Sequence, residues 1–234
     1  MTQETAVGHT DPTPNELNNL KKSPLQKALS AVITVLLVFS TLFTGTYVYV
    51  TYKYAPLYVD GRSMLPTLNN FSNPNLKYEL GYMETGDAVK QNLKRFDIAI
   101  YSLGGTSGII KRVIGLPHET IKITKGDERD FVYILPANAD EFVLLEEDYL
   151  ATTNLNTTYL NSWTGDYELA LNEGEYFMLG DNRSQSNDSR FIGAVTYSQL
   201  LGRLKFIYGA AATVTADDKI KGRKFYPIWQ WRFY

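Results

Sequence analysis

The sequence contains no cysteine and only two histidines, His9 and His118, among its 234 residues. The lack of cysteine excludes disulfide bonds, thiolate catalysis and cysteine-ligated zinc. No HExxH spacing occurs, so a histidine metal site is not expected either. The net charge of −2 gives no reason to expect nucleic-acid binding. We therefore predict no metal, no other cofactor and no nucleic-acid partner.

Residues 28–52 form a long stretch without a charged side chain. At about 1.5 Å per residue, a helix of this length exceeds the hydrocarbon core of a bilayer, which is about 30 Å thick. A buried core helix would show a polar stripe, and a cleavable signal peptide would have a shorter apolar core with a small-residue exit. We favour an uncleaved, single-pass transmembrane anchor over these two alternatives.

The charges around this stretch predict its orientation in the plasma membrane. Lys21, Lys22 and Lys27 precede it, whereas Lys53 stands nearly alone after it. Cytoplasmic flanks carry the excess of positive charge, so the N-terminus is predicted to be cytoplasmic and the residues after Lys53 extracytoplasmic. Four tyrosines between positions 47 and 54 suit the far membrane interface, where aromatic rings gather.

The rest of the chain reads as a mostly β domain. Short apolar runs such as "FDIAIYS", "GIIKRVIGL", "TIKITKG" and "EYFMLG" are separated by Gly, Asn and Asp, a pattern typical of antiparallel strands. Only "TYSQLLGRL" hints at a helical turn. We divide the chain into a cytoplasmic tail (1–27), an anchor (28–52) and an extracytoplasmic domain (53–234), with an inserted β-rich subdomain at about 124–172.

A lone serine, Ser63, lies in "VDGRSMLPTL" shortly after the anchor. Most loop serines only solvate or cap. Here Gly61 permits close backbone approach, Pro66 stiffens the exit, and Met64 and Leu68 supply apolar neighbours. Together they suggest a rigid, aimed hydroxyl, which becomes a nucleophile only if a base takes its proton.

The base that would activate Ser63 is sought first among histidines and then among lysines. His9 lies in the predicted tail, and His118 follows Leu-Pro at a turn, where we expect it to face solvent. Lys111 lies in the apolar run "SGIIKRVIGLP", and strand alternation places it on one face with Ile109 and Val113. Burial there would lower its pKa from about 10.4, as a lysine base requires. An edge-strand lysine that blocks aggregation is the competing reading.

The run "GDNRSQSNDSR", residues 180–190, is dense in polar side chains directly after an apolar strand. A solvated loop is the ordinary reading of such a run. The functional reading is that its hydroxyls orient the lysine amine. On that reading Asp181 and Asp188 pair with the nearby Arg183 and Arg190, which would lock the loop.

Taken together, the anchor, "GRSMLPTL", "FDIAIY", "IIKRVIGLP" and "EYFMLGDNRSQSNDSR" resemble bacterial type I signal peptidases in content and order. The resemblance extends from about residue 28 to 203. It implies a Ser/Lys serine endopeptidase with a mostly β, signal-peptidase-like antiparallel body and no metal. Such an enzyme removes N-terminal signal peptides from exported preproteins.

The resemblance also implies roles for individual residues. Ser63 matches the nucleophile, Lys111 the general base, and Ser186 the hydroxyl that orients the lysine amine. The backbone N–H of Ser63 would stabilise the oxyanion, and Gly61 stands where some members have a second donor serine, so a Gly61 backbone group or a water is the candidate second donor. The structural polar residues of the last block match Asp181, Arg183, Asp188 and Arg190.

The family cleaves after small residues in an A-x-A pattern, which shallow aliphatic pockets would select. An extended substrate would add backbone hydrogen bonds along the strands. The lipid bilayer brings enzyme and preprotein together, and we expect a monomer. The positions that match the family's pocket walls are Leu57, Val59, Met64, Leu68, Ile109 and Ile110.

The sequence departs from the family at two usual glycines, where Phe96 and His118 stand instead. Both substitutions predict a different local backbone there. Three alternative functions remain beside the general peptidase. The first is a dedicated processing or assembly factor for one pilin or surface protein, and the second is a non-enzymatic membrane-tethered chaperone. The third is a self-cleaving repressor, which the anchor and the lack of a DNA-binding motif disfavour.

Overall fold

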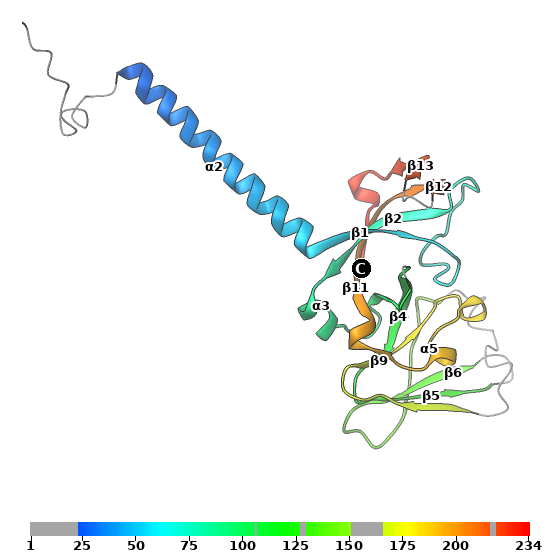
Figure 1. Cartoon of the computed structure of the whole chain (residues 1–234). Helices are drawn as coiled ribbons and strands as arrows, with labels where there is room; N and C mark the ends of the chain where they lie inside the picture. The colour runs from blue at the N-terminus through cyan, green and yellow to red at the C-terminus, as the bar shows by residue number, and fades with distance from the viewer. Residues whose placement is uncertain (1–22, 106, 127–129, 151–165, 216–218) are drawn as a thin grey trace, which may run out of the picture. The chain divides into compact units, whose positions relative to one another are not determined.

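The computed structural model describes residues 23–105, 107–126, 130–150, 166–215 and 219–234 (Figure 1). The chain divides into two compact units, residues 1–50 and residues 51–234. Each unit is described by itself below.

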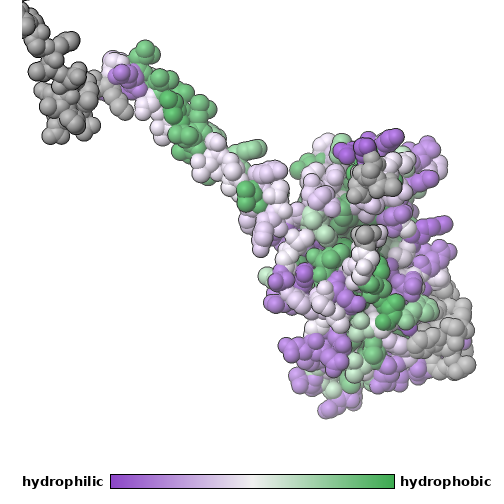
Figure 2. Space-filling view, in the orientation of Figure 1, coloured by the Kyte–Doolittle hydropathy of each residue, from purple (hydrophilic) through white to green (hydrophobic). Residues whose placement is uncertain are grey.

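A single long helix, α2 (Pro24–Lys53), makes up the described part of the first unit and ends just inside the second. It is long and apolar enough to cross a membrane, and its apolar side chains are exposed along most of its length (Figure 2). Ser23 and Gln26 cap its start reciprocally. The hydroxyls of Thr34 and Thr41 bond back to carbonyls one turn earlier, so neither remains an unsatisfied donor in an apolar surrounding. The predicted anchor, residues 28–52, lies within this helix.

A nine-stranded antiparallel sheet forms the body of the second unit, with the order β1-β2-β11-β3-β4-β9-β10 and with β14 and β15 also pairing with β11. The predicted mostly β, antiparallel fold class is confirmed. The strands of this sheet are β1 (Tyr54–Val59), β2 (Tyr78–Thr85), β3 (Ile98–Tyr101), β4 (Ile109–Gly115), β9 (Glu175–Leu179), β10 (Val195–Thr196), β11 (Leu200–Ala211), β14 (Lys224–Phe225) and β15 (Arg232–Phe233).

Two smaller sheets account for the remaining strands among the described residues of this unit. One has four strands in the order β7-β6-β5-β8, and the other pairs β12 with β13. Their bounds are β5 (Thr120–Thr124), β6 (Phe131–Leu135), β7 (Val143–Leu144), β8 (Tyr167–Ala170), β12 (Thr213–Val214) and β13 (Ile220–Lys221). The short helices are α3 (Asp87–Gln91), η1 (Arg183–Gln185), α5 (Ser189–Ile192), η2 (Tyr197–Gln199) and η3 (Ile228–Gln230).

The longest strand, β11, pairs with β2, β3, β14 and β15 and has two register shifts where it meets β2. A Cβ at Gly81 in β2 would lie 2.6 Å from the Phe206 carbonyl oxygen and 2.7 Å from Ile207 Cδ1. Only glycine allows β2 to approach the irregular part of β11 so closely. The ring of Trp231, next to β15, stacks on Phe206 with centroids 5.2 Å apart and so packs the last segment onto this strand.

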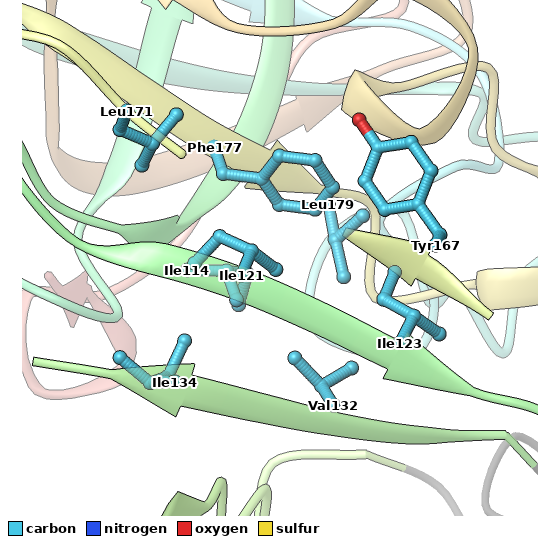
Figure 3. Close-up of a cluster of buried hydrophobic side chains, with 9 residues drawn as sticks. All are labelled: Ile114, Ile121, Ile123, Val132, Ile134, Tyr167, Leu171, Phe177 and Leu179. Atoms are coloured by element: carbon cyan, nitrogen blue, oxygen red, sulfur yellow. The ribbon is translucent and has the colours of Figure 1, made fainter. Parts of the chain in front are cut away.

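The four-stranded sheet overlaps residues 124–172 and is called the inserted subdomain below; its first strand begins at Thr120, four residues before the predicted start. The division of the chain at these bounds stays a prediction. The sheet packs through an apolar cluster onto β4 and β9 of the main sheet (Figure 3). Burial of these aliphatic and aromatic side chains is the main force that joins the two sheets. The cluster contains Ile114, Ile121, Ile123, Val132, Ile134, Tyr167, Leu171, Phe177 and Leu179.

Replacing Ile121 with alanine should lower the free energy of unfolding by about 2–5 kcal/mol, because the side chain is fully buried between the sheets and its loss leaves a cavity. Denaturant unfolding of the purified protein measures this. Lys122→Ala, on the opposite face of the same strand, serves as the control and should cost about 1 kcal/mol or less. Equal losses from both variants would contradict the packing described here.

Candidate active site

The loop that carries Ser63 joins β1 to β2 and is closed at its base by one side chain. Asn69 donates from Nδ2 to the carbonyl oxygens of Val59 (3.0 Å) and Gly61 (2.9 Å), and its Oδ1 accepts from the Glu79 N–H (3.0 Å). These three bonds tie both ends of the loop to the start of β2. Asn69 has a φ of 58°, which asparagine tolerates better than most residues. The nucleophile candidate therefore sits on a fixed loop.

The polar segment after β9 holds the same loop from the other side. The Asn182 N–H donates to the Ser63 carbonyl oxygen (2.9 Å), and Asn182 Nδ2 donates to the Arg62 carbonyl oxygen (3.0 Å). A Cβ at Gly180 would lie 2.5 Å from the Ser63 carbonyl oxygen, so glycine is what lets the two backbones approach. The segments "GRSMLPTL" and "EYFMLGDNRSQSNDSR" are therefore in direct contact.

Lys111 reaches Ser63 from β4. Its Nζ lies 2.8 Å from Ser63 Oγ in a hydrogen bond, and it also donates to the Ile110 carbonyl oxygen at 3.0 Å. Lys111 is only 4% exposed, and Ile109 and Val113 of its face pack together in an apolar cluster, as strand alternation predicted. β4 lies between β3 and β9, so the edge-strand reading of this lysine is wrong.

Burial lowers the pKa of the Lys111 amine from 10.5 to about 8. The physical cause is desolvation, which disfavours the ammonium form. The carboxylates of Asp188 and Asp181 oppose this effect, and the Arg190 guanidinium reinforces it. The lysine is thus able to exist as a free amine near neutral or mildly alkaline pH, in hydrogen-bond contact with a hydroxyl.

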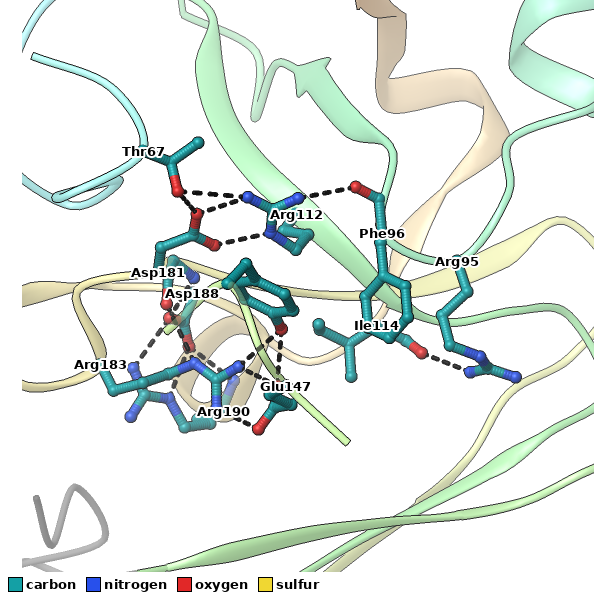
Figure 4. A network of polar contacts seen from close by, with 12 residues as sticks. Thr67, Arg95, Phe96, Arg112, Ile114, Glu147, Asp181, Arg183, Asp188 and Arg190 are labelled. Atoms are coloured by element: carbon teal, nitrogen blue, oxygen red, sulfur yellow. Dashed lines mark hydrogen bonds and ion pairs between the residues drawn. The ribbon is translucent and has the colours of Figure 1, made fainter. Parts of the chain in front are cut away.

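Arg112, the next residue of β4, points to the opposite face and joins four segments (Figure 4). It binds Asp181 with two hydrogen bonds, from Nε (2.8 Å) and Nη2 (2.6 Å). It also donates to the Phe96 carbonyl oxygen (2.9 Å) and to Thr67 Oγ1 (3.3 Å), while Thr67 Oγ1 itself donates to Asp181. One buried guanidinium thereby links β4, the Ser63 loop, the turn before β3 and the polar segment after β9.

The polar segment itself is held by a second buried ion pair. Arg190 Nε and Nη2 donate to the two carboxylate oxygens of Asp188 at 2.7 and 2.8 Å, and Asp188 Oδ2 accepts from the Gly180 N–H (3.0 Å). Asp188 thus pairs with Arg190, as expected. Asp181 instead takes its paired bonds from Arg112, because Arg183 turns away in η1 and bonds to Glu147 of the inserted subdomain.

Ser186 and Gly61 lie near the dyad, but neither contacts Lys111 through an observed hydrogen bond. Ser186 Oγ is buried and has no hydrogen-bond partner among the residues that the structure describes. The Gly61 N–H donates to Asp60 Oδ1 (2.6 Å), and Gly61 has a φ of 85°. Their suggested roles in orienting the amine and stabilising an oxyanion remain predictions.

Three of the six predicted pocket residues are buried in the core, and the other three are partly exposed. Val59, Met64 and Leu68 are at most 3% exposed and pack in one cluster with the partly exposed Leu57 and Ile110. Ile109 packs in a different cluster, on the Lys111 face of β4. Leu57 and Ile110 are therefore the members of the first cluster that offer accessible aliphatic surface.

Phe96 and His118, the two departures from the family pattern, both adopt the left-handed backbone conformation that glycine favours. Their φ values are 73° and 68°. The expectation of a local backbone that differs from the family's stays a prediction. His118 is exposed in the turn after β4, as expected, so it does not replace Lys111 as the base candidate.

The comparisons with known proteins identify the family. A family model described as signal peptidase, peptidase S26, matches residues 26–209. The chain belongs to this family. The match spans the apolar helix, the Ser63 loop, β4 and the polar segment. The predicted enzyme class, a serine endopeptidase of the signal peptidase I type, is confirmed.

Three relatives illustrate the extent of the similarity. Signal peptidase I S of Bacillus subtilis (strain 168) is 33% identical over 80% of this chain and 90% of its own length. Signal peptidase I of Streptococcus pneumoniae serotype 4 is 26% identical over 81% of this chain and 95% of its own. A crystal structure of a signal peptidase I from Enterococcus faecalis V583 is 36% identical, covers 49% of this chain and 97% of that chain, and superposes with a TM-score of 0.37.

Sequence reasoning did not identify Thr67, Asn69, Arg112 or Asn182 as parts of the site. Arg112 could have been suspected, since it neighbours the lysine and strand alternation turns it to the other face. The other three act through contacts with residues that are distant in the chain, which no local pattern reveals.

Within the described residues no group of three or more His, Asp or Glu side chains could hold a metal ion.

Gly180→Ala should reduce peptidase activity by about 10²-fold, because misplacement of reacting groups by roughly 1 Å has effects of this size. The new methyl group would meet Ser186 Oγ at 2.2 Å and the Ser63 carbonyl oxygen at 2.5 Å. Cleavage of a preprotein in detergent–phospholipid micelles measures the loss. Gly105→Ala is the matched control, since a Cβ there meets nothing closer than 4.0 Å. Equal activity of both variants would refute the close approach.

Proposed function

We propose that this signal peptidase uses Ser63 as nucleophile and Lys111 as general base to cut preproteins after small residues in an A-x-A pattern. The observation that carries the proposal is the 2.8 Å contact between Lys111 Nζ and Ser63 Oγ, made by a lysine whose pKa burial lowers to about 8. No other described side chain is hydrogen-bonded to Ser63 Oγ. The pair satisfies both requirements of a nucleophile–base dyad, geometry and a matched pKa.

In the first half-reaction, the neutral Lys111 amine takes the Ser63 proton as Oγ attacks the scissile carbonyl carbon. The resulting tetrahedral intermediate carries a negative oxygen. Among the described residues none accepts a hydrogen bond from the Ser63 N–H, which leaves that group available to stabilise the oxyanion. Collapse of the intermediate breaks the C–N bond, and the Lys111 ammonium returns its proton to the leaving amine.

In the second half-reaction, the same amine acts on water. The acyl group is now an ester on Ser63 Oγ, and Lys111 is neutral again. It takes a proton from an attacking water molecule and then gives it to Oγ as the ester bond breaks. This restores Ser63 and releases the signal peptide with a free carboxyl end. One lysine therefore serves as base and acid in both steps, as a histidine does in other serine proteases.

Substrate selection and location follow from the apolar walls and the helix. The partly exposed Leu57 and Ile110 beside the dyad suit small aliphatic side chains. The long apolar helix would anchor the enzyme in the plasma membrane, with its N-terminus cytoplasmic by the charge rule and the Ser63–Lys111 dyad extracytoplasmic. Sharing one bilayer with exported preproteins raises their effective concentration, and a monomer suffices for this chemistry.

Ser63→Ala and Lys111→Met should each lower kcat by at least roughly 10³-fold while the protein stays folded, because removing either member of a nucleophile–base pair removes most of the activity. The assay incubates purified full-length protein with a preprotein carrying an A-x-A site and sequences the new N-terminus. Ser198→Ala and Lys122→Met, away from the dyad, are the controls and should cut normally after the second alanine. Near-normal activity of Lys111→Met would assign the base elsewhere.

The pH profile of kcat/KM should rise through a midpoint near 8, since only the deprotonated Lys111 amine acts as base and burial sets its pKa near that value. At pH 7 roughly a tenth of the enzyme would be in the active form. Activity measured from pH 5 to 10 on one peptide substrate tests this. A profile that is already flat above about pH 7.5 would instead indicate a base with a carboxylate or histidine pKa.

A further inference from the structure

Two side chains of the inserted subdomain, Glu147 and Tyr149, contact Arg183 and Arg112 respectively. Glu147 lies after β7, and its two carboxylate oxygens accept hydrogen bonds from Arg183 Nη1 (3.1 Å) and Nη2. The Arg183 side chain is fully buried and that of Glu147 is only 10% exposed. This buried ion pair bridges the insertion and the polar segment after β9.

Tyr149, two residues further, covers Arg112. Its ring centre lies 4.1 Å from Arg112 Cζ, the distance of a close cation–π contact. Its hydroxyl donates to Glu147 Oε1 (2.6 Å) and accepts from Arg183 Nη2 (3.1 Å). Phe96 packs edge-on against the same ring with centroids 5.5 Å apart. Tyr149 therefore contacts both Arg112 of β4 and Arg183 of the polar segment after β9.

Both arginines act on the backbone around Ser63. Arg183 Nε donates to the Gly180 carbonyl oxygen (3.1 Å), and Gly180 packs directly against the Ser63 carbonyl. Arg112 holds Asp181 and Thr67, and Thr67 lies on the Ser63 loop. A shift of either guanidinium would therefore move the segments that set the Ser63 Oγ–Lys111 Nζ distance.

We propose that Tyr149 and Glu147 are positioning residues for the Ser63–Lys111 dyad. Through these two side chains the inserted subdomain holds Arg112 and Arg183 in place. The ring of Tyr149 shields the Arg112–Asp181 pair from water, and the carboxylate of Glu147 sets the position of Arg183. Neither residue touches the reacting atoms. The proposal rests on the assignment of Ser63 and Lys111 made above and gives the insertion a role in the chemical step.

The test compares kcat and KM of full-length Tyr149→Leu, Tyr149→Phe and Glu147→Gln with wild type on one A-x-A preprotein. Tyr149→Leu removes both ring and hydroxyl and should lower kcat by about 10–100-fold, the effect of a sub-ångström to 1 Å misplacement. Tyr149→Phe keeps the ring over Arg112 and should recover most of this loss. KM should stay within about twofold, because the residues that would bind substrate are untouched.

Two matched controls separate positioning from general damage to the insertion. Glu146→Gln changes the exposed neighbour of Glu147, and Tyr133→Leu removes a tyrosine from β6 of the same sheet. Both should keep wild-type kcat. Melting temperatures of all variants, with kcat measured well below them, show whether a loss of rate follows the folded fraction.

The proposal is overturned if folded Tyr149→Leu and Glu147→Gln both retain kcat within about twofold of wild type. It is also overturned if their losses match those of Tyr133→Leu or simply follow the unfolded fraction. Should Tyr149→Leu fail to fold, Glu147→Gln alone decides by the same criterion. Ser63→Ala in the same assay separates the positioning proposal from the dyad assignment, since activity in that variant would contradict the assignment of Ser63 and Lys111.

Discussion

In the proposed mechanism the Lys111 amine has to be neutral before it can take a proton from Ser63, and burial is the largest of the effects that lower its pKa. That constraint accounts for much of the surrounding architecture. The lysine lies on a strand flanked on both sides by other strands, and it is 4% exposed. Asp181 and Asp188 oppose the effect, since their negative charge favours the ammonium form. Each of these carboxylates is engaged by an arginine, Asp181 by Arg112 and Asp188 by Arg190, so neither is a bare charge beside the amine.

Lys111 and Arg112, adjacent on β4, have basic side chains in very different surroundings. Lys111 has few polar partners, and burial lowers the pKa of its amine. The buried guanidinium of Arg112 is instead paired with Asp181, the Phe96 carbonyl and Thr67. Strand alternation places these two side chains on opposite faces of β4. On the second face the ring of Tyr149 lies over the Arg112 guanidinium.

Local patterns in the sequence predicted the apolar helix, the strands β3, β4 and β9 of the main sheet and the opposite faces of Lys111 and Arg112. They did not predict β2, because Gly81 and the mixed polarity of Tyr78–Thr85 obscure its strand pattern, and that glycine is explained only by the irregular β11 beside it. They also did not predict the Arg112–Asp181 ion pair. Asp181 was expected to pair with an arginine nearby in the chain, whereas Arg112 lies 69 positions away. Long-range pairing of this kind depends on the folded sheet order, which periodicity does not encode.

The most direct test of the account is the titration of Lys111 itself. Carbon NMR of the lysine Cε groups in folded Ser63→Ala would resolve it, with the Lys111 signal assigned by its absence from a Ser63→Ala, Lys111→Met double variant. The account predicts a titration midpoint near 8 for Lys111, while exposed lysines titrate at about 10.4. A Lys111 midpoint at or above about 10 would mean that burial does not neutralise the amine, and it would contradict the dyad as the source of catalysis.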